Sequence, residues 1–250
     1  MTLQEFRVII PGIEREITVT KATCYLSVVV PARNEEDRLA GTLILLAQTL
    51  EPMGIDYEVI VVDDGSIDNT ANIAKILGAR VISNYRSRGI AAAFRSGAEI
   101  AKGSVVMLCP ADIEDFSFLR EAISASKAYD VVSVSKRHPD SVVIGYDKWR
   151  WFLSNSYHGF VNLLFHKFEE CTDTHYVKLY DGVVLQWIIK RCRINGPVGE
   201  TEIMLHARKA GCTFFEIPAR ILHNAHGSKT SPKLILRTIS ELFRLWVGKP

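Results

Sequence analysis

Two short polar segments follow apolar runs of the sequence, and both carry residue types that bind nucleotides. The first is PARNEE at residues 31–36, and the second is DDGS at residues 63–66. The first presents backbone N–H groups, a guanidinium and carboxylates beside the start of a helix, where anions bind. Adjacent carboxylates after a buried strand accept hydrogen bonds from a base or ribose, or approach a cation. The alternative is an ordinary loop in which Asn34 or Asp68 caps the next helix.

Two further polar segments suggest phosphate and metal chemistry. They are CPADIED at residues 109–115 and HNAHGSK at residues 223–229. In an extended chain Asp112 and Glu114 point the same way, so they can share a divalent cation with a diphosphate. The imidazoles, hydroxyl and ammonium of the second segment suit a phosphate clamp. Solvated acids in a loop and a basic surface loop are the simpler alternatives.

The elements that position these segments alternate along the first half of the chain. Apolar runs predict strands at residues 25–31, 58–63, 80–83 and 104–109. Apolar residues at helical spacing predict helices at residues 35–50, 69–77 and 90–101. This alternation predicts an α/β fold with a mostly parallel central sheet flanked by helices. In such sheets the ligand crevice lies at the carboxyl ends of the strands, where the polar segments fall.

The second half of the chain is less regular. It predicts strands at residues 130–135 and 213–217, and helices at residues 148–168, 201–210 and 232–247. A strand or hairpin is expected near residues 6–10 and 16–20. We expect one domain over residues 1–250, divided into four parts. These are an N-terminal extension at 1–22, a nucleotide-binding half at 23–115, an acceptor-binding half at 116–230 and a C-terminal amphipathic helix at 231–250.

Composition excludes several classes of protein. The 250 residues are 48% hydrophobic and 23% charged, a mixture that argues against disorder, collagen-like repeats and coiled coil. A net charge of +2 gives no indication of a nucleic-acid partner. From Ile203 onward the net charge is +6, which suits phosphate or an anionic surface, or simply a solvated basic face. The five cysteines form no CxxC pair, so we expect reduced thiols in a cytoplasmic protein.

The order of the motifs is more specific than any one of them. A P-A-R-N-E turn, then V-V-D-D-G-S-x-D-x-T, R-G-I-A-A-A-F-R-S-G-A and P-A-D, together resemble the family 2 glycosyltransferases, which have the A-type glycosyltransferase (GT-A) fold. The resemblance covers about residues 25–229. Within that family the chain looks most like the polyprenyl-phosphate sugar transferases, the dolichyl-phosphate glucose and mannose synthases. That likeness rests on spaced Ser154, Asn162, Asp173 and Lys178, on the segment from Thr201 to Gly211, and on a glucose-type H-x-x-x-G-S-K ending.

The resemblance implies an inverting transfer of a hexose from a UDP-glucose or GDP-mannose type donor to polyprenyl or dolichyl phosphate. Ten residues of this sequence match positions that hold the nucleotide sugar in the family: Pro31, Arg33, Glu35, Val62, Asp64, Ala111, Lys136, Arg137, His223 and Lys229. Asp112 matches the metal ligand of the family's D-x-D motif, and Glu114 stands where a Gln often completes the metal shell. The implied cofactor is Mg²⁺ or Mn²⁺.

One position departs from the family pattern. Pro110 replaces the first Asp of D-x-D and removes one carboxylate. Metal binding would then depend on Asp112, Glu114 and the diphosphate itself. A catalytically silent relative that only binds a nucleotide sugar is therefore an alternative to an enzyme.

The acceptor decides which catalytic groups are needed. A lipid phosphate is already an anion near neutral pH, so positioning and charge neutralisation suffice and no general base is required. A hydroxyl acceptor, in a soluble glycoside or a polysaccharide, needs a base. Asp173 and Glu202 are the candidates for that role, and with Asp112 they make up the expected catalytic residues.

Two segments suit contact with a membrane surface. Residues 146–168 contain eight aromatic residues, and the closing helix mixes apolar residues with Lys and Arg. Packing on the domain or a dimer contact is the alternative. No window reaches about 18 uninterrupted apolar residues, and the charged N-terminus lacks the apolar region of a signal peptide. We therefore expect a cytoplasmic protein that is at most peripheral on the cytoplasmic membrane face.

Overall fold

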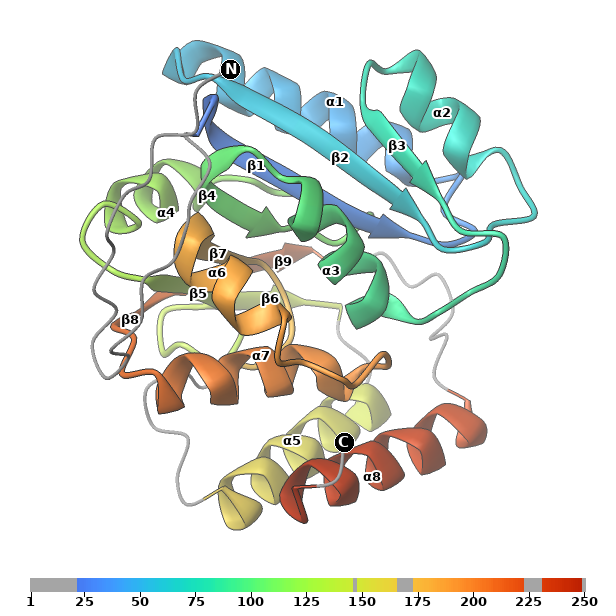
Figure 1. Ribbon diagram of the computed structural model, residues 1–250, viewed down its shortest axis with the longest axis vertical. Coiled ribbons are helices and arrows are strands. Elements are labelled where there is room, and N and C mark those ends of the chain that lie inside the picture. The colour runs from blue at the N-terminus through green and yellow to red at the C-terminus, as the bar shows by residue number, and fades with distance from the viewer. Residues whose placement is uncertain (1–21, 146–147, 166–172, 223–230, 249–250) are drawn as a thin grey trace.

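A seven-stranded sheet runs through the molecule, as the computed structural model shows (Figure 1). The structure describes residues 22–145, 148–165, 173–222 and 231–248. The strand or hairpin expected near residues 6–10 and 16–20 lies outside these ranges, as do His223 and Lys229. The order of strands across the sheet is β3-β2-β1-β4-β7-β5-β8.

The strands of this sheet are β1 (Cys24–Ala32), β2 (Tyr57–Asp63), β3 (Arg80–Ser83), β4 (Gly103–Leu108), β5 (Val131–Ser135), β7 (Lys178–Asp181) and β8 (Phe214–Pro218). Neighbouring strands are parallel except where β7 pairs with β4 and β5. A separate two-stranded parallel sheet contains β6 (Val142–Ile144) and β9 (Arg220–Leu222). The expected mixed α/β fold with a mostly parallel sheet is therefore confirmed.

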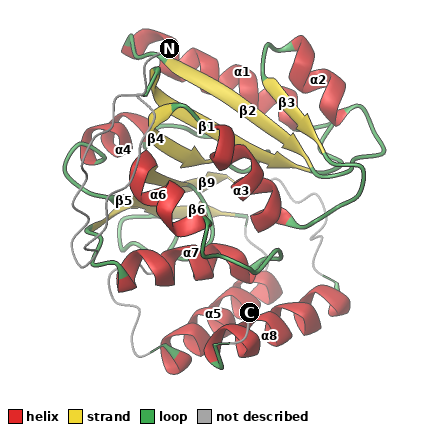
Figure 2. Ribbon diagram, in the orientation of Figure 1, coloured by secondary structure: helices red, strands yellow, loops and turns green. Residues whose placement is uncertain are grey.

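Helices cover both faces of the large sheet (Figure 2). They are α1 (Leu39–Leu50), α2 (Thr70–Ile76), α3 (Ile90–Ile100), α4 (Leu119–Ala125), α5 (Lys148–Leu164), α6 (Gly182–Ile189), α7 (Val198–Lys209) and α8 (Pro232–Trp246), with a short 3-10 helix at Glu51–Met53. Helices α1, α2 and α4 contribute to one hydrophobic cluster, and α3, α5, α6, α7 and α8 to the other. Because both faces are covered, the central strands are nearly continuous apolar runs.

The expected elements recur with shifted ends and four additions. Pro31 lies inside β1 and pairs with Val62 of β2. On the other side of β1 the pairing with β4 ends at Val29, so the N–H that proline lacks is not needed for a hydrogen bond to β4. The first helix begins at Leu39 and not at residue 35. The sequence did not predict α4, α6, β7 or the small sheet.

The division of the chain into one domain with four parts stays a prediction. Helix α5 ends at Leu164, and the end expected at residue 168 lies outside the described residues. Among the residues that the structure describes, no helix is both long and apolar enough to cross a membrane.

Candidate active site

The sheet topology brings the polar segments to one edge. Strands β1, β2 and β4 are parallel, so residues 33–38, 64–69 and 109–115 all leave the same edge. Strands β4 and β5 are each antiparallel to β7 and therefore point the same way. Residues 136–137, after β5, and residues 173–177, before β7, consequently reach that edge as well.

Reciprocal hydrogen bonds join the loops after β1 and β2. The Asn34 N–H donates to Ser66 Oγ at 2.9 Å, and the Ile67 N–H donates to Asn34 Oδ1 at 3.0 Å. The Glu35 N–H donates to Thr70 Oγ1 at 2.8 Å. Asn34 adopts a φ of +53°, a left-handed conformation that asparagine tolerates. It therefore does not cap α1, whose N-terminal boundary residue makes no side-chain capping bond.

Asp64 anchors the segment that leads into α3. Its carboxylate accepts from Asn84 Nδ2 at 2.9 Å and Ser87 Oγ at 2.7 Å, and from the backbone N–H groups of Arg88 at 2.8 Å and Gly89 at 2.9 Å. Burial alone would raise the pKa of the Asp64 carboxyl, but these hydrogen bonds hold that pKa below its ordinary value. Asp64 therefore holds the loop at residues 84–89 in place beside its own loop. Neighbouring Asp63 is also buried and accepts one bond, from the Ser66 N–H at 3.0 Å.

The remaining residues assigned to the nucleotide in the first half differ in exposure. Arg33 is exposed, whereas Pro31, Val62 and Ala111 are buried. The Val62 side chain belongs to the hydrophobic core, so only its backbone faces the edge. The carbonyl of Ala111 accepts a hydrogen bond at 2.9 Å from Thr42 Oγ1 on α1, which fixes the loop that carries Asp112.

Arg38 links two carboxylates at this edge. Its Nη2 lies 2.6 Å from Glu35 Oε2, and its Nη1 lies 3.5 Å from Asp112 Oδ2. Asp112 is 42% exposed, and Glu114 is exposed too. Both alternate with buried Ala111 and Ile113, although residues 111–112 form a turn and not extended chain.

These carboxylates fit a shared metal site better than a complete protein cage. No group of three or more His, Cys, Asp or Glu side chains within the described ranges is arranged to hold a metal ion. Mg²⁺ and similar ions are often held by one or two carboxylates together with substrate phosphates. Asp112 and Glu114 can supply that protein part, with Pro110 in the place of the missing acid.

Lys136 and Asp173 form a buried ion pair at the end of β5. Lys136 Nζ lies 2.9 Å from Asp173 Oδ2, and the two side chains are 9% and 3% exposed. The His175 N–H donates to Asp173 Oδ1 at 3.1 Å. Burial would raise the pKa of the Asp173 carboxyl, but Lys136 and Lys178 lower it below its ordinary value. A carboxylate held in this way is a weak proton acceptor near neutral pH.

Arg137 is fixed against α5. Its Nη2 donates to the Ser154 carbonyl at 2.7 Å and to Ser154 Oγ at 2.8 Å, and its Nη1 donates to Asn155 Oδ1. Its guanidinium lies 5.4 Å from the centre of the Trp151 ring. Two members of the spaced pattern, Ser154 and Asp173, therefore each contact one of the two consecutive cations. A third, Asn162, lies within hydrogen-bond distance of His158.

Glu202 has its carboxylate turned to the backbone. The fully buried side chain accepts from the Arg193 N–H at 3.0 and 2.9 Å and from the Ile194 N–H at 2.8 Å. These bonds hold the loop between α6 and α7. The geometry therefore favours a structural role for Glu202 over the role of a base.

Glu200 is the carboxylate that the sequence did not single out. It is 5% exposed, and its Oε2 has no hydrogen-bond partner among the described residues. Burial raises the pKa of Glu200 to about 7, against the opposing effect of Lys178. It accepts from the backbone N–H of Tyr176, a residue with a φ of +131°. Such strain costs on the order of 1–3 kcal/mol and concentrates at functional sites.

The neighbouring His175 is a neutral group. Its Nε2 lies 3.0 Å from the Pro197 carbonyl, and burial lowers its pKa to about 4. Its ring packs edge-on against Tyr157, whose hydroxyl lies 2.6 Å from Thr201 Oγ1. The sequence offered one signal for this group, since residues 173–178 stand in one motif segment and Glu200 directly precedes another, which begins at Thr201.

Comparison with known proteins assigns the family. The family model described as "Glycosyl transferase family 2" matches residues 27–180, more than half of the chain. The chain therefore belongs to glycosyl transferase family 2, and the resemblance seen in the sequence is confirmed.

Curated relatives match the chain over less than half of their own length. The undecaprenyl-phosphate 4-deoxy-4-formamido-L-arabinose transferase of Edwardsiella ictaluri is 35% identical over 127 residues, which is 47% of this chain and 38% of that protein. The protein of the same name from Aeromonas hydrophila is 34% identical over 126 residues, or 45% of this chain and 37% of that protein.

Solved structures share the fold over nearly the whole chain. Mannosyl-3-phosphoglycerate synthase from Rubrobacter xylanophilus superimposes with a TM-score of 0.69 and 21% identity, covering 91% of this chain and 76% of that one. Glucosyl-3-phosphoglycerate synthase from Mycobacterium tuberculosis was solved with Mn²⁺, UDP and glucosyl-3-phosphoglycerate. It superimposes with a TM-score of 0.69 and 18% identity, covering 92% of this chain and 82% of that one. These likenesses confirm the expected GT-A fold.

Proposed function

We propose that this protein transfers a hexose from a nucleotide sugar to a polyprenyl phosphate, with inversion at the anomeric carbon. The observation that carries the proposal is the pair of consecutive cations, Lys136 and Arg137, at the sheet edge that also presents Asp112. One reaction partner brings a diphosphate and the other a phosphate, so a site with two fixed cations suits both. The names of the curated relatives, which act on undecaprenyl phosphate, support a lipid acceptor.

The nucleotide sugar, of the UDP-glucose or GDP-mannose type, would lie across the loops after β1 and β2. Arg33 is exposed for contact with the diphosphate, and the backbone at Pro31 and Val62 lines the strand ends. Asp64 would act by holding the loop before α3, since its carboxylate already accepts four hydrogen bonds. His223 and Lys229 complete this proposal from the sequence alone.

The reaction needs little covalent chemistry from the protein. An oxygen of the lipid phosphate attacks the anomeric carbon, the bond from that carbon to the diphosphate oxygen breaks, and the nucleoside diphosphate leaves with the electron pair. Lys136 and Arg137 neutralise phosphate charge, and Asp173 and Ser154 keep these two cations in place. No proton has to be removed from an acceptor that is already anionic.

A divalent cation, Mg²⁺ or Mn²⁺, belongs to this proposal as a group shared between protein and diphosphate. Asp112 would hold it, with Glu114 as the second carboxylate, and it would supply charge stabilisation for the departing diphosphate. Arg38, 3.5 Å from Asp112, contributes positive charge at the same place. The protein would carry out this reaction at the cytoplasmic face of a membrane.

A second candidate acceptor is a hydroxyl group, as in a soluble glycoside or a polysaccharide. The observation in its favour is Glu200, a buried carboxylate whose pKa of about 7 suits a general base. Solved neighbours are named as synthases of phosphoglycerate glycosides. Glu200 would replace Asp173 and Glu202 as the base in that reaction.

A transfer assay tests the proposal. Labelled UDP- and GDP-hexoses are each incubated with a short polyprenyl phosphate in the presence of Mg²⁺, Mn²⁺ or EDTA. We expect a labelled lipid with one donor. Hydrolysis of the donor without a lipid product would indicate another acceptor, and binding without turnover would identify a silent relative.

A further inference from the structure

Helix α8 leaves one apolar side uncovered. Leu242 is its buried residue, whereas four apolar side chains are 50–69% exposed: Leu236, Ile239, Phe243 and Trp246. They follow one another at intervals of three, four and three residues, so they form a single stripe along the helix. Phe243 and Trp246 also contact each other, with ring centres 5.8 Å apart.

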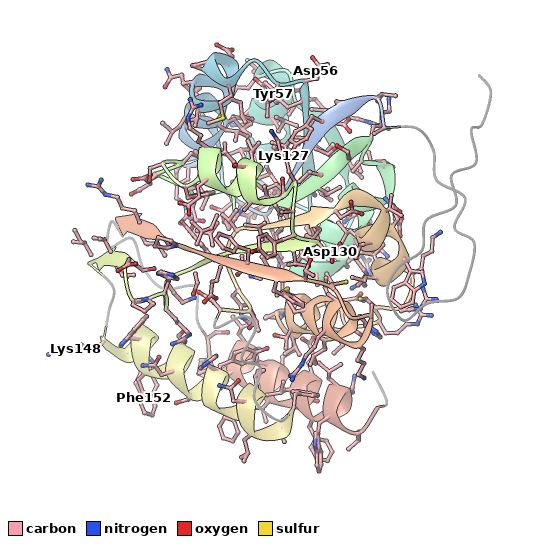
Figure 3. All side chains as sticks on the ribbon, turned by 90° about the vertical axis from the view of Figure 1, so that its left-hand side faces the viewer. Asp56, Tyr57, Lys127, Asp130, Lys148 and Phe152 are labelled. Carbon is pink, nitrogen blue, oxygen red and sulfur yellow. The ribbon has the colours of Figure 1, made fainter. Side chains whose placement is uncertain are left out.

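Helix α5 carries a second stripe of the same kind. Trp149, Phe152, Phe160 and Leu163 are 56–72% exposed and share one side of the helix, while Val161 is fully buried. The rings of Trp149 and Phe152 stack at 5.5 Å. Figure 3 shows Phe152 on the outer side of α5, pointing away from the body of the molecule.

The two helices lie at the same end of the molecule, beyond α7, in both views (Figures 1 and 3). Val161 of α5 and Leu242 of α8 join the same hydrophobic cluster, and α8 packs against α7. The apolar stripes are the parts of these helices that this packing leaves exposed.

Positive charge accompanies the stripes. The two helices contain five Lys and Arg residues and one acidic residue, Glu241. Glu241 is largely buried and accepts a hydrogen bond from Arg237 Nε at 2.7 Å. Lys233, Arg237 and Arg244 stand at i, i+4 and i+11, on one row beside the apolar stripe of α8.

We infer that α5 and α8 together form a docking surface for a bilayer that contains anionic lipids. Trp and Phe side chains beside a row of cations are the arrangement of helices that lie in a membrane interface. A second copy of the chain fits this surface less well, because two faces with the same excess of cations repel each other. The aromatic side chains would enter the headgroup region, and the cations would contact lipid phosphates.

Docking in this way would place the proposed active site close to the bilayer. Arg137, at the carboxyl end of β5, donates hydrogen bonds to Ser154 and Asn155 of α5 and lies over the Trp151 ring. A lipid phosphate at the membrane surface would therefore meet the site cation that α5 holds. This last step rests on the proposed function, whereas the docking itself does not.

Sedimentation of the full-length chain with lipid vesicles tests the inference. Vesicles of phosphatidylcholine alone are compared with an equal mixture of phosphatidylcholine and phosphatidylglycerol, at low and high salt, without any donor. We expect preferential binding to the anionic vesicles that weakens with salt. The double variant Phe243→Ser/Trp246→Ser and the variant Arg244→Glu should each weaken the partition coefficient about tenfold or more. Ile76→Ser, at an 83% exposed position on α2, is the matched control and should bind normally.

Three results would overturn the inference. They are absence of binding to both kinds of vesicle, equal binding by the α8 variants and the wild type, and a wild-type dimer that Phe243→Ser/Trp246→Ser converts to monomer in sedimentation velocity. Circular dichroism during thermal unfolding checks that the variants fold. Transfer to a detergent-solubilised acceptor should survive in the α8 variants. If wild-type transfer is missing there while vesicle binding is present, the proposed function fails and the docking surface stands.

Discussion

The Asp64 carboxylate accepts four hydrogen bonds at the proposed nucleotide side of the site. Replacing it by Ala leaves two backbone N–H groups, of Arg88 and Gly89, without their acceptor. We expect Asp64→Ala to lower the free energy of unfolding by about 2–4 kcal/mol in urea titrations. Asp63→Ala is the matched control and should cost about 1 kcal/mol, because Asp63 accepts one hydrogen bond. Equal losses for the two variants would contradict this assignment.

The lowered pKa of the Asp64 carboxyl predicts how the free energy of unfolding depends on pH. Its pKa in the folded protein lies below the ordinary value of 3.8, so its contribution to stability is present above that value and disappears as the pH falls through the folded pKa. The stability difference between the wild type and Asp64→Ala should therefore be constant near neutral pH and shrink below about pH 4. A difference that grows on acidification would be the opposite result.

Glu200 should behave in the opposite sense. Burial raises its pKa from 4.5 to about 7, so the folded protein loses stability relative to the unfolded chain as the pH rises between those values. Glu200→Gln should then gain about 3 kcal/mol over the wild type above pH 7, with little difference below about pH 4. Urea unfolding of both proteins over this pH range measures the difference in the free energy of unfolding, and thermal unfolding gives the same comparison.

Activity of the same variant separates the two acceptors. With a lipid phosphate as acceptor, Glu200→Gln should retain transfer, because no proton is removed. Loss of transfer by roughly a hundredfold or more would instead assign Glu200 as a general base.

Pro110 stands where a third carboxylate would strengthen the proposed metal site. Asp112 and Glu114 are the proposed metal ligands in the loop after β4, whose other acid, Asp115, lies 3.7 Å from Arg220 Nε. Pro110→Asp therefore adds a third carboxylate to the proposed metal site. We expect this variant to respond to lower concentrations of Mg²⁺ or Mn²⁺ than the wild type, in transfer assays or in titrations of nucleotide binding. An unchanged metal response would show that Pro110 has no part in metal binding.

Sequence pattern located Asp64 and Glu202 but not Glu200, and it could not orient their side chains. Residues two apart on a helix face nearly opposite ways, so Glu202 is directed to the loop at residues 193–194 while Glu200 is directed to Tyr176. The choice between them depends on packing against α6 and β7, neither of which the sequence revealed. For the same reason the sequence could not show the structural role of Asp64, because its hydrogen-bond donors lie in the loop at residues 84–89.

At the scale of elements, the start of α3 depends on a close approach of two loops. Gly89 has a φ of +108°, and a Cβ there would collide with the Asn195 carbonyl, which also accepts from the Ala91 N–H at 3.2 Å. Gly89→Ala should therefore lower the free energy of unfolding by more than about 2 kcal/mol.

A second glycine provides the control for that variant. Gly41 lies inside α1 with open space around its Cβ position, so Gly41→Ala should raise stability by about 0.5–1 kcal/mol. Chemical denaturation of both variants gives the comparison. Destabilisation by both would point to a general intolerance of alanine and not to the contact at Asn195.

Elements with a strong periodic pattern were predictable from the sequence, and the others were not. Strands β1 and β2 are long apolar runs, and they appear within two residues of their expected ends. Helix α1 starts late because residues 34–36 donate their N–H groups to the loop after β2. Strand β7 and α6 follow each other directly in a mostly apolar segment, in which periodicity does not mark the boundary that Asp181 makes by capping α6.

At the scale of the whole molecule, the direction of the strands decides which residues meet. Alternation of strands and helices predicted the parallel half of the sheet, β3-β2-β1-β4. The antiparallel insertion of β7 between β4 and β5 is a long-range pairing with no local signal. That insertion brings Lys136 and Asp173 to the edge where Asp112 lies, and so assembles the acceptor side of the proposed site.

The most direct test of the proposed function compares a lipid phosphate with two acceptors that offer a hydroxyl group. Labelled sugar transfer is measured from the preferred nucleotide sugar to polyprenyl phosphate, to the corresponding polyprenol and to 3-phosphoglycerate, with detergent and metal held constant. We expect a product with polyprenyl phosphate and none with polyprenol, because Lys136 and Arg137 would bind the phosphate and no base activates a hydroxyl. Transfer to polyprenol or to 3-phosphoglycerate at a comparable rate would contradict it.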